Sequence, residues 1–149
     1  MALKPDRIES LVDVSFFMNE AQTRGGVATL STGGSGVAMD DSDAVVTYSA
    51  TASGKVPMGI LLNDVVDIDL TRQHINFHKD EVPVGNKVSL LRVGQVTTDR
   101  INGDPSAGEG AYVSSSGLLG AETSGAMKVG TFLSSKDADG FAKVSVNIV

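Results

Sequence analysis

Cysteine and tryptophan are absent from this chain of 149 residues, and aromatic side chains are few, with five Phe and two Tyr. Without cysteine there can be no disulfide bond, no thiolate ligand for a metal ion and no cysteine nucleophile. Any assembly of several copies must therefore be held together by side-chain packing and hydrogen bonds.

Basic residues are outnumbered, since 12 Lys and Arg stand against 18 Asp and Glu and leave a net charge of −6. Nucleic-acid binders draw most of their affinity from cations that neutralise phosphates, so this balance argues against a nucleic-acid partner. No run of about 18 apolar residues and no basic-then-apolar leader is found, so neither a membrane span nor a secretory signal is predicted. We expect a protein that is soluble where it is made and that has no membrane partner.

β-Branched residues and glycine are abundant instead, with 19 Val and 6 Ile against 11 Leu, and with 17 Gly. Branching at Cβ restricts the χ1 angle in a helix and suits the pleated surface of a sheet, while glycine suits tight turns. The length is that of one domain with a core of its own. We therefore predict an all-β fold, a small antiparallel β-barrel or β-sandwich with an extended N-terminal arm.

Six segments are predicted to be strands, most of them because apolar and polar side chains alternate. They cover residues 44–51, 65–70, 87–96, 111–114, 129–134 and 141–148. Since a turn at residues 136–140 precedes the last one, residues 129–134 and 141–148 should form an antiparallel hairpin. The side chains expected in the core are Val66, Ile68, Leu70, Leu90, Phe132, Val144 and Val146.

Residues 1–24 are predicted to form the N-terminal arm and residues 25–149 the β-barrel domain. Apolar side chains alternate over residues 12–18, which favours an extended segment with one apolar face, and a helix over residues 8–16 is the alternative. Such an apolar segment near a chain end is expected to pack either on the protein's own core or on a neighbouring molecule. The candidate residues for a capsid or inter-subunit contact are Val12, Val14, Phe16, Phe17 and Met18.

Residues 25–43 are rich in glycine and offer little to bury, so a loop or a loose hairpin is predicted there. The Gly-Gly-Ser-Gly sequence at residues 33–36 lacks the Lys-Ser/Thr pair and the helix start of a phosphate-binding loop. Three other glycines, Gly59, Gly94 and Gly130, begin similar Gly-x-apolar sequences and are interpreted as similar corners of the barrel.

His74 and His78, the only histidines, are four residues apart, a spacing that would place both on one face of a helix. In the extended chain that the surrounding residues predict, they would be roughly 13 Å apart, too far to share one metal ion. The acidic turn at residues 137–140 resembles the start of a calcium loop but lacks the later ligands. No metal site is predicted.

Catalytic arrangements are not evident either. Asp67 and Asp69 fit the polar face of an alternating strand, and the Gly-x-Ser-x-Gly pattern of a nucleophile elbow is absent. The sequence therefore predicts no catalytic residue and no cofactor.

Several phrases of the sequence resemble the head decoration or cement proteins of tailed bacteriophages. Two of them are Gly-Ile-Leu-Leu-Asn-Asp-Val at residues 59–65 and Asp-Leu-Thr-Arg-Gln-His-Ile-Asn-Phe-His at residues 69–78. Similar phrases follow from Pro83, Gly108, Lys128 and Gly140, so the resemblance covers about residues 25–149. These are structural phrases, and they include no family active site.

The resemblance implies a β-barrel or β-sandwich body that assembles as trimers or dimers on the capsid exterior. The implied partners are the phage major capsid protein and further copies of this chain, with a trimer favoured over a dimer. The protein would then be made in the cytoplasm of the host bacterium and end in the virion. Two alternatives stay open: a trimeric β-barrel enzyme with a site between subunits, and another phage module such as a tail-associated protein.

Overall fold

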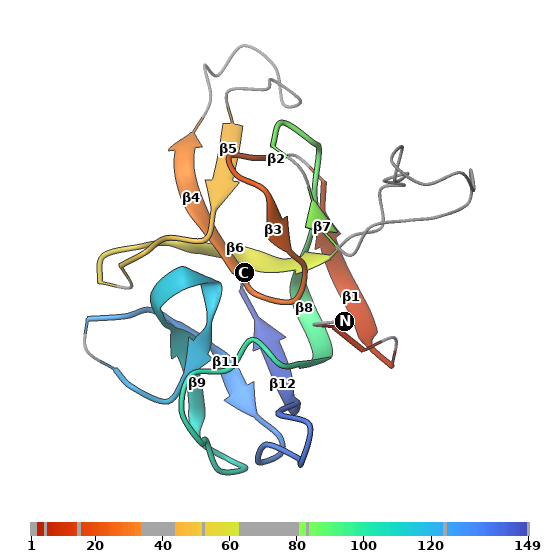
Figure 1. The fold of residues 1–149 in the computed structure, drawn as a ribbon, viewed down its shortest axis with the longest axis vertical. Coiled ribbons are helices and arrows are strands. Elements are labelled where there is room, and N and C mark those ends of the chain that lie inside the picture. The colour runs from red at the N-terminus through yellow and green to blue at the C-terminus, as the bar shows by residue number, and fades with distance from the viewer. Residues whose placement is uncertain are drawn as a thin grey trace.

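The computed structural model describes residues 3–4, 6–14, 16–33, 44–51, 53–62, 81–82, 84–123 and 125–148. This part of the chain is almost entirely strand, with a single 3-10 turn, η1 (Ser115–Gly117). The strands are β1 (Ile8–Asp13), β2 (Phe17–Met18), β3 (Gln22–Thr23), β4 (Val27–Gly33), β5 (Ala44–Thr47), β6 (Pro57–Leu62), β7 (Glu81–Val82), β8 (Ser89–Thr98), β9 (Gly110–Val113), β10 (Leu119–Gly120), β11 (Lys128–Phe132) and β12 (Ala142–Asn147) (Figure 1). The predicted all-β fold is confirmed.

Strand β8 is the longest strand and joins two halves of the main sheet (Figure 1). Its residues 89–91 pair with β6 and residues 93–98 with β12, while β1 pairs along residues 90–95. Because a strand has only two edges, β6 and β12 lie end to end on one edge of β8, and β1 lies on the other. The sheet continues through β4, β5 and β2 in one half and through β11, β9 and β10 in the other.

The main sheet is mixed and open. Strand β2 pairs in parallel with β5, whereas the other strand pairs of this sheet are antiparallel. Within the described residues the two ends of the strand order, β10 and β2, do not pair with each other. A β-barrel and a β-sandwich therefore both remain predictions for this fold.

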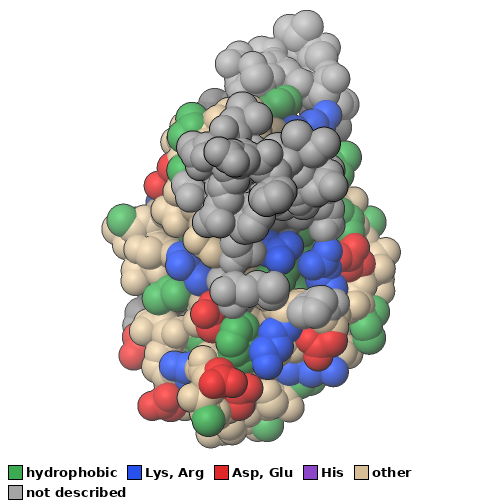
Figure 2. Space-filling view, turned by 45° about the vertical axis from the view of Figure 1, so that its right-hand side comes forward, with side chains coloured by type: hydrophobic (Ala, Val, Ile, Leu, Met, Phe, Trp, Pro, Cys, Tyr) green, Lys and Arg blue, Asp and Glu red, His purple; other side chains and the backbone are tan. Residues whose placement is uncertain are grey.

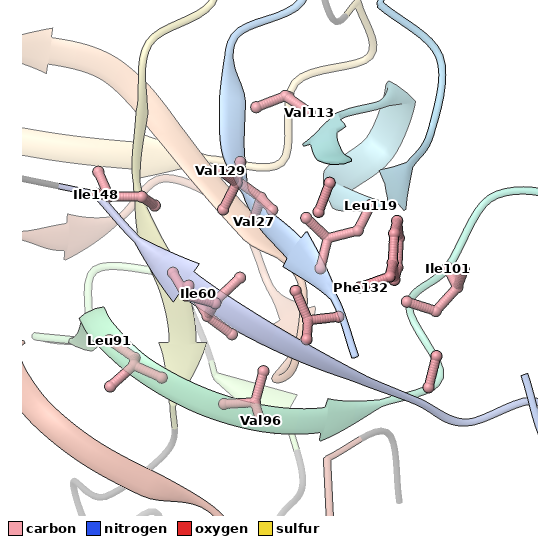
Figure 3. Close-up of a cluster of buried hydrophobic side chains, with 14 of the residues drawn as sticks. Val27, Ile60, Leu91, Val96, Ile101, Val113, Leu119, Val129, Phe132 and Ile148 are labelled. Atoms are coloured by element: carbon pink, nitrogen blue, oxygen red, sulfur yellow. The ribbon is translucent and has the colours of Figure 1, made fainter. Parts of the chain in front are cut away.

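The larger hydrophobic core lies between the two halves of the sheet. Side chains of β4, β6 and β8 meet those of β9, β11 and β12 there, with Phe132 fully buried among them (Figure 3). Leu3, from the start of the chain, belongs to the same cluster. The two halves thus stabilise each other through one shared apolar interior.

A second core lies on the opposite face of β4 and β6. In β6, Ile60 and Leu62 point into the first cluster, while Leu61 between them points into the second, where Met18 and Tyr48 cover it. Alternate residues of a strand face opposite sides, so a strand buried on both faces needs an uninterrupted apolar run. This explains the sequence Ile-Leu-Leu in the middle of the chain.

Several strand predictions are confirmed. Strands β11 and β12 form the predicted antiparallel hairpin, with Phe132 opposite Val144. Of the expected core residues, Leu90, Phe132, Val144 and Val146 are buried. The predicted strand at residues 65–70 lies outside the described residues, as do Val66, Ile68, Leu70 and both histidines.

The prediction that residues 25–43 bury little is wrong for their first part. Val27 and Ala28 of β4 are fully buried, and this strand lies between β5 and β6 inside the sheet. Small side chains are buried there because the neighbouring strands β5 and β6 cover the backbone of β4 on both sides. The hairpin alternative is the better one, since β4 and β5 are consecutive and antiparallel.

The three similar glycines lie beside irregularities in the strand pairing. The register shifts next to Gly59 in the β4–β6 pair, next to Gly94 in the β1–β8 pair and next to Gly130 in the β9–β11 pair. At Gly94 the backbone of β1 comes so close that an added Cβ would lie 2.1 Å from the Ile8 carbonyl oxygen. Bulges of this kind bend a strand, so these glycines mark bends in the sheet.

Candidate interaction surface

The acidic turn at residues 137–140 is held by its own backbone. Asp137 Oδ1 accepts hydrogen bonds from the N–H groups of Asp139 and Phe141, each at 2.9 Å. The bond from Phe141 contributes most to lowering the pKa of the Asp137 carboxyl. The interpretation as a turn is confirmed. Among the described residues no three His, Cys, Asp or Glu side chains lie close enough to hold a metal ion.

The N-terminal segment is anchored at both ends. At its start Leu3 is buried in the first core cluster, and the Lys4 N–H donates to the Thr97 carbonyl oxygen at 2.9 Å. At its end Met18 is buried in the second cluster, and its N–H donates to the Asn86 carbonyl oxygen at 2.9 Å. Between these anchors β1 lies along the edge of β8, which confirms the extended prediction over the helical alternative.

Apolar side chains are exposed between the two anchors. Ile8 is 57% exposed, Leu11 46%, Val12 36% and Val14 52%. Several apolar side chains left this exposed within one short segment are unusual on a protein without partners. These four residues are called the β1 surface below.

The five residues singled out from the sequence differ in how far they are buried. Val12 and Val14 lie on the β1 surface, whereas Met18 is enclosed by the second core cluster. Phe16 and Phe17 are half-buried, and Phe16 packs against that cluster. Ile8 and Leu11 were not among these five candidate contact residues. Both lie in residues 8–16, the segment for which a helix was the alternative prediction.

A buried tyrosine fixes the chain that follows the N-terminal segment. The Tyr48 hydroxyl donates to the Thr23 carbonyl oxygen at 2.8 Å and accepts from the Gly26 N–H at 2.9 Å. Burial raises the pKa of this hydroxyl above its ordinary value, against the smaller lowering effect of the Gly26 bond. Tyr48 therefore remains a neutral donor and joins β3 and β4 to the segment after β5.

A carboxylate supports the same junction. Glu20 Oε1 accepts a hydrogen bond from Thr47 Oγ1 at 2.8 Å and from the Tyr48 N–H at 3.0 Å. The Arg100 guanidinium lies over the Tyr48 ring, 5.1 Å from its centroid. These contacts hold the end of the N-terminal segment in a defined place, so the β1 surface has a fixed position on the body.

Charged side chains surround the β1 surface. Arg7 pairs with Glu9, and Arg92 Nη1 lies 3.7 Å from the Asp13 carboxylate. In the space-filling view, basic and acidic side chains are interspersed with apolar ones (Figure 2). Exposed apolar side chains with charged neighbours are the usual arrangement at a protein–protein interface.

The sequence matches a known protein family. A family model described as "Structural cement protein (E217 gp24/Pam3 gp6)" matches residues 10–147. The chain belongs to this phage cement protein family. No curated protein matches the sequence.

Membership makes the chain a structural cement protein of a phage virion, a class that associates with the capsid. The matched residues run from the middle of β1 to the last residue of β12. The cement protein has no helix, in the part of the chain that the structure describes, that is long and apolar enough to cross a membrane. The family resemblance inferred from the sequence is thus confirmed.

Proposed function

We propose that this cement protein binds the exterior of an assembled phage capsid as a homo-oligomer, a trimer in preference to a dimer. It clamps neighbouring copies of the major capsid protein and so stabilises the head against internal pressure. The observation that carries the proposal is the β1 surface, a set of exposed apolar side chains at a fixed position on a cement protein.

The β1 surface supplies free energy for docking. Each Val or Leu side chain that is fully withdrawn from water contributes about 1.5–3 kcal/mol. Because Val12 and Val14 are already partly covered, about 1 kcal/mol each is the expected contribution. Copies linked in one oligomer bind with a high effective concentration, so such modest contacts add up to lasting attachment.

Deleting the N-terminal segment would not test this proposal cleanly. The deletion would also remove Leu3 and Met18, two fully buried side chains of the two cores. Emptying such sites costs about 2–5 kcal/mol each, so lost binding could reflect an unfolded protein. Substitutions on the β1 surface avoid this problem.

The test is the double variant Val12→Ser/Val14→Ser, mixed with undecorated heads of the same phage. We expect weaker co-sedimentation and a lower disruption temperature of the heads than with the unmodified protein. The matched control is Val56→Ser/Met127→Ser, which changes two side chains that are 47% and 48% exposed elsewhere.

Two results count against the proposal in different ways. If the Val12→Ser/Val14→Ser variant binds and protects heads like its control, these residues are not the contact. If the unmodified protein fails to bind heads at all, the decorating function itself is wrong.

A further inference from the structure

The face of the sheet that points away from the first core has an unusual composition. Strand pairing places Ile8 opposite Gln95, Gln95 opposite Ser145, and Ser145 opposite Thr131. Residues paired across antiparallel strands point to the same side of a sheet. Since both neighbours of Ser145, Val144 and Val146, are buried, this row across β1, β8, β12 and β11 faces outward.

Parallel rows extend the same face. Thr97 pairs with Lys143 on one side of the first row, and Val93 pairs with Asn147 and Leu11 on the other. None of these side chains is buried, so the rows form an open surface, called the outer sheet face below. Its centre consists of uncharged side chains, and Ile8 and Leu11 of the β1 surface form one margin.

Every charged residue of β8, β9, β11 and β12 is basic, although the chain carries a net charge of −6. Arg92 is engaged, because its Nε donates to the Ile148 carbonyl oxygen at 3.1 Å and its Nη1 approaches Asp13. Lys128 and Lys143 are exposed. Their neighbours Val129, Ala142 and Val144 are buried, so both lysines point outward.

The two carboxylates of β1, Glu9 and Asp13, lie on opposite sides of the sheet. Glu9 is opposite Gly94, and Gly94 is opposite Val146, whose side chain points into the core. Glu9 therefore does not point out of the outer sheet face. Asp13 is opposite Leu90, which points away from the first core, and its carboxylate is paired with Arg92. Besides this ion pair, the charged residues on this side of the four strands are Lys128 and Lys143.

We propose that the outer sheet face docks on an acidic surface of the phage capsid. This inference rests on the function proposed above and names the chemistry of its partner. A neutral centre matches the depletion of charge in the middle of protein interfaces, and lysines at the margin complement carboxylates. A second copy bound through the same face would bring four lysines together, while Asp13 of each copy is already paired with its own Arg92, so that occupant is disfavoured.

The experiment places a negative charge on the outer sheet face and measures binding to undecorated heads by co-sedimentation. Ser145→Glu puts a carboxylate at the centre of the face, and its matched control Ser106→Glu puts one in the exposed loop before β9. Lys143→Glu reverses a charge of the face, and Lys55→Glu makes the same change before β6. Each face variant should weaken binding at least about tenfold relative to its control, because like charges at an interface cost several kcal/mol.

The salt dependence of binding separates lost electrostatic attraction from damage to the fold. Binding of the unmodified protein should weaken as salt rises, and binding of Lys143→Glu should change less. If both face variants bind heads as tightly as their controls, the inference is overturned while the decorating function stands. Failure of the unmodified protein to bind heads would instead remove the proposed function.

Discussion

Gly117 lies so close to the ring of Tyr48 that a Cβ on Gly117 would be 2.5 Å from Tyr48 Cγ. This contact joins η1, between β9 and β10, to the chain that follows β5, so it connects the two halves of the molecule. The backbone at Gly117 has φ of +75°, a left-handed conformation that suits glycine. The two halves are therefore matched in shape at this point.

Gly117→Ala should destabilise the protein through both the left-handed backbone and the clash with the ring. The control is Gly103→Ala, where φ is +76° but no atom lies within 4 Å of an added Cβ. The difference between the two variants isolates the clash and should be about 1–3 kcal/mol in the free energy of unfolding in urea. Equal losses for both variants would show that the ring can move aside at little cost.

Tyr48→Phe should also destabilise the protein, although it removes a single oxygen atom. The change leaves the Gly26 N–H without its acceptor and the Thr23 carbonyl oxygen without its donor. Losing the partners of buried polar groups costs about 1–3 kcal/mol. Thermal unfolding followed by circular dichroism measures this loss, and an unchanged melting temperature would mean that water replaces the hydroxyl.

The Asp137 turn should make part of the stability dependent on pH. Hydrogen bonds from the backbone, first that of Phe141, lower the pKa of this carboxyl in the folded state. A lowered folded pKa means that the stabilisation is complete above the unfolded pKa of about 3.9 and is lost as pH falls through the folded pKa.

The variant Asp137→Asn keeps an acceptor oxygen but cannot titrate. The stability difference between it and the unmodified protein should stay constant near neutral pH and shrink in acid, below about pH 4. Urea unfolding over a series of pH values measures this difference. A difference that does not change with pH would show that the charge of Asp137 contributes nothing to the turn.

Much of the fold follows from the alternation of side chains. The β11–β12 hairpin is predictable because Val144 and Val146 alternate with polar residues beside a strong turn. Strand β4 is not predicted by the same analysis because glycines flank it and its buried apolar residues, Val27 and Ala28, are small. Burial there depends on strands that are distant in the sequence, which no local pattern reports.

The candidate surface is only partly visible in the sequence, for a similar reason. Alternation over residues 12–18 suggests one continuous apolar face, but the chain pairs with β8 up to Asp13 and with β5 from Phe17. Val12 is consequently exposed, whereas Met18 is buried. Alternation in β12 predicts that Lys143, Ser145 and Asn147 share one side of the strand. The outer sheet face as a whole cannot be predicted from the sequence, because it depends on the register between β1, β8 and β12.

Electron microscopy of phage heads with and without this protein tests the central claim most directly. Purified protein is added to undecorated heads, and the two samples are reconstructed under the same conditions. The account predicts additional density on the outside of the shell, at contacts between neighbouring capsid proteins, together with heads that withstand higher temperature. Reconstructions without added density, or with density only inside the shell, would contradict it.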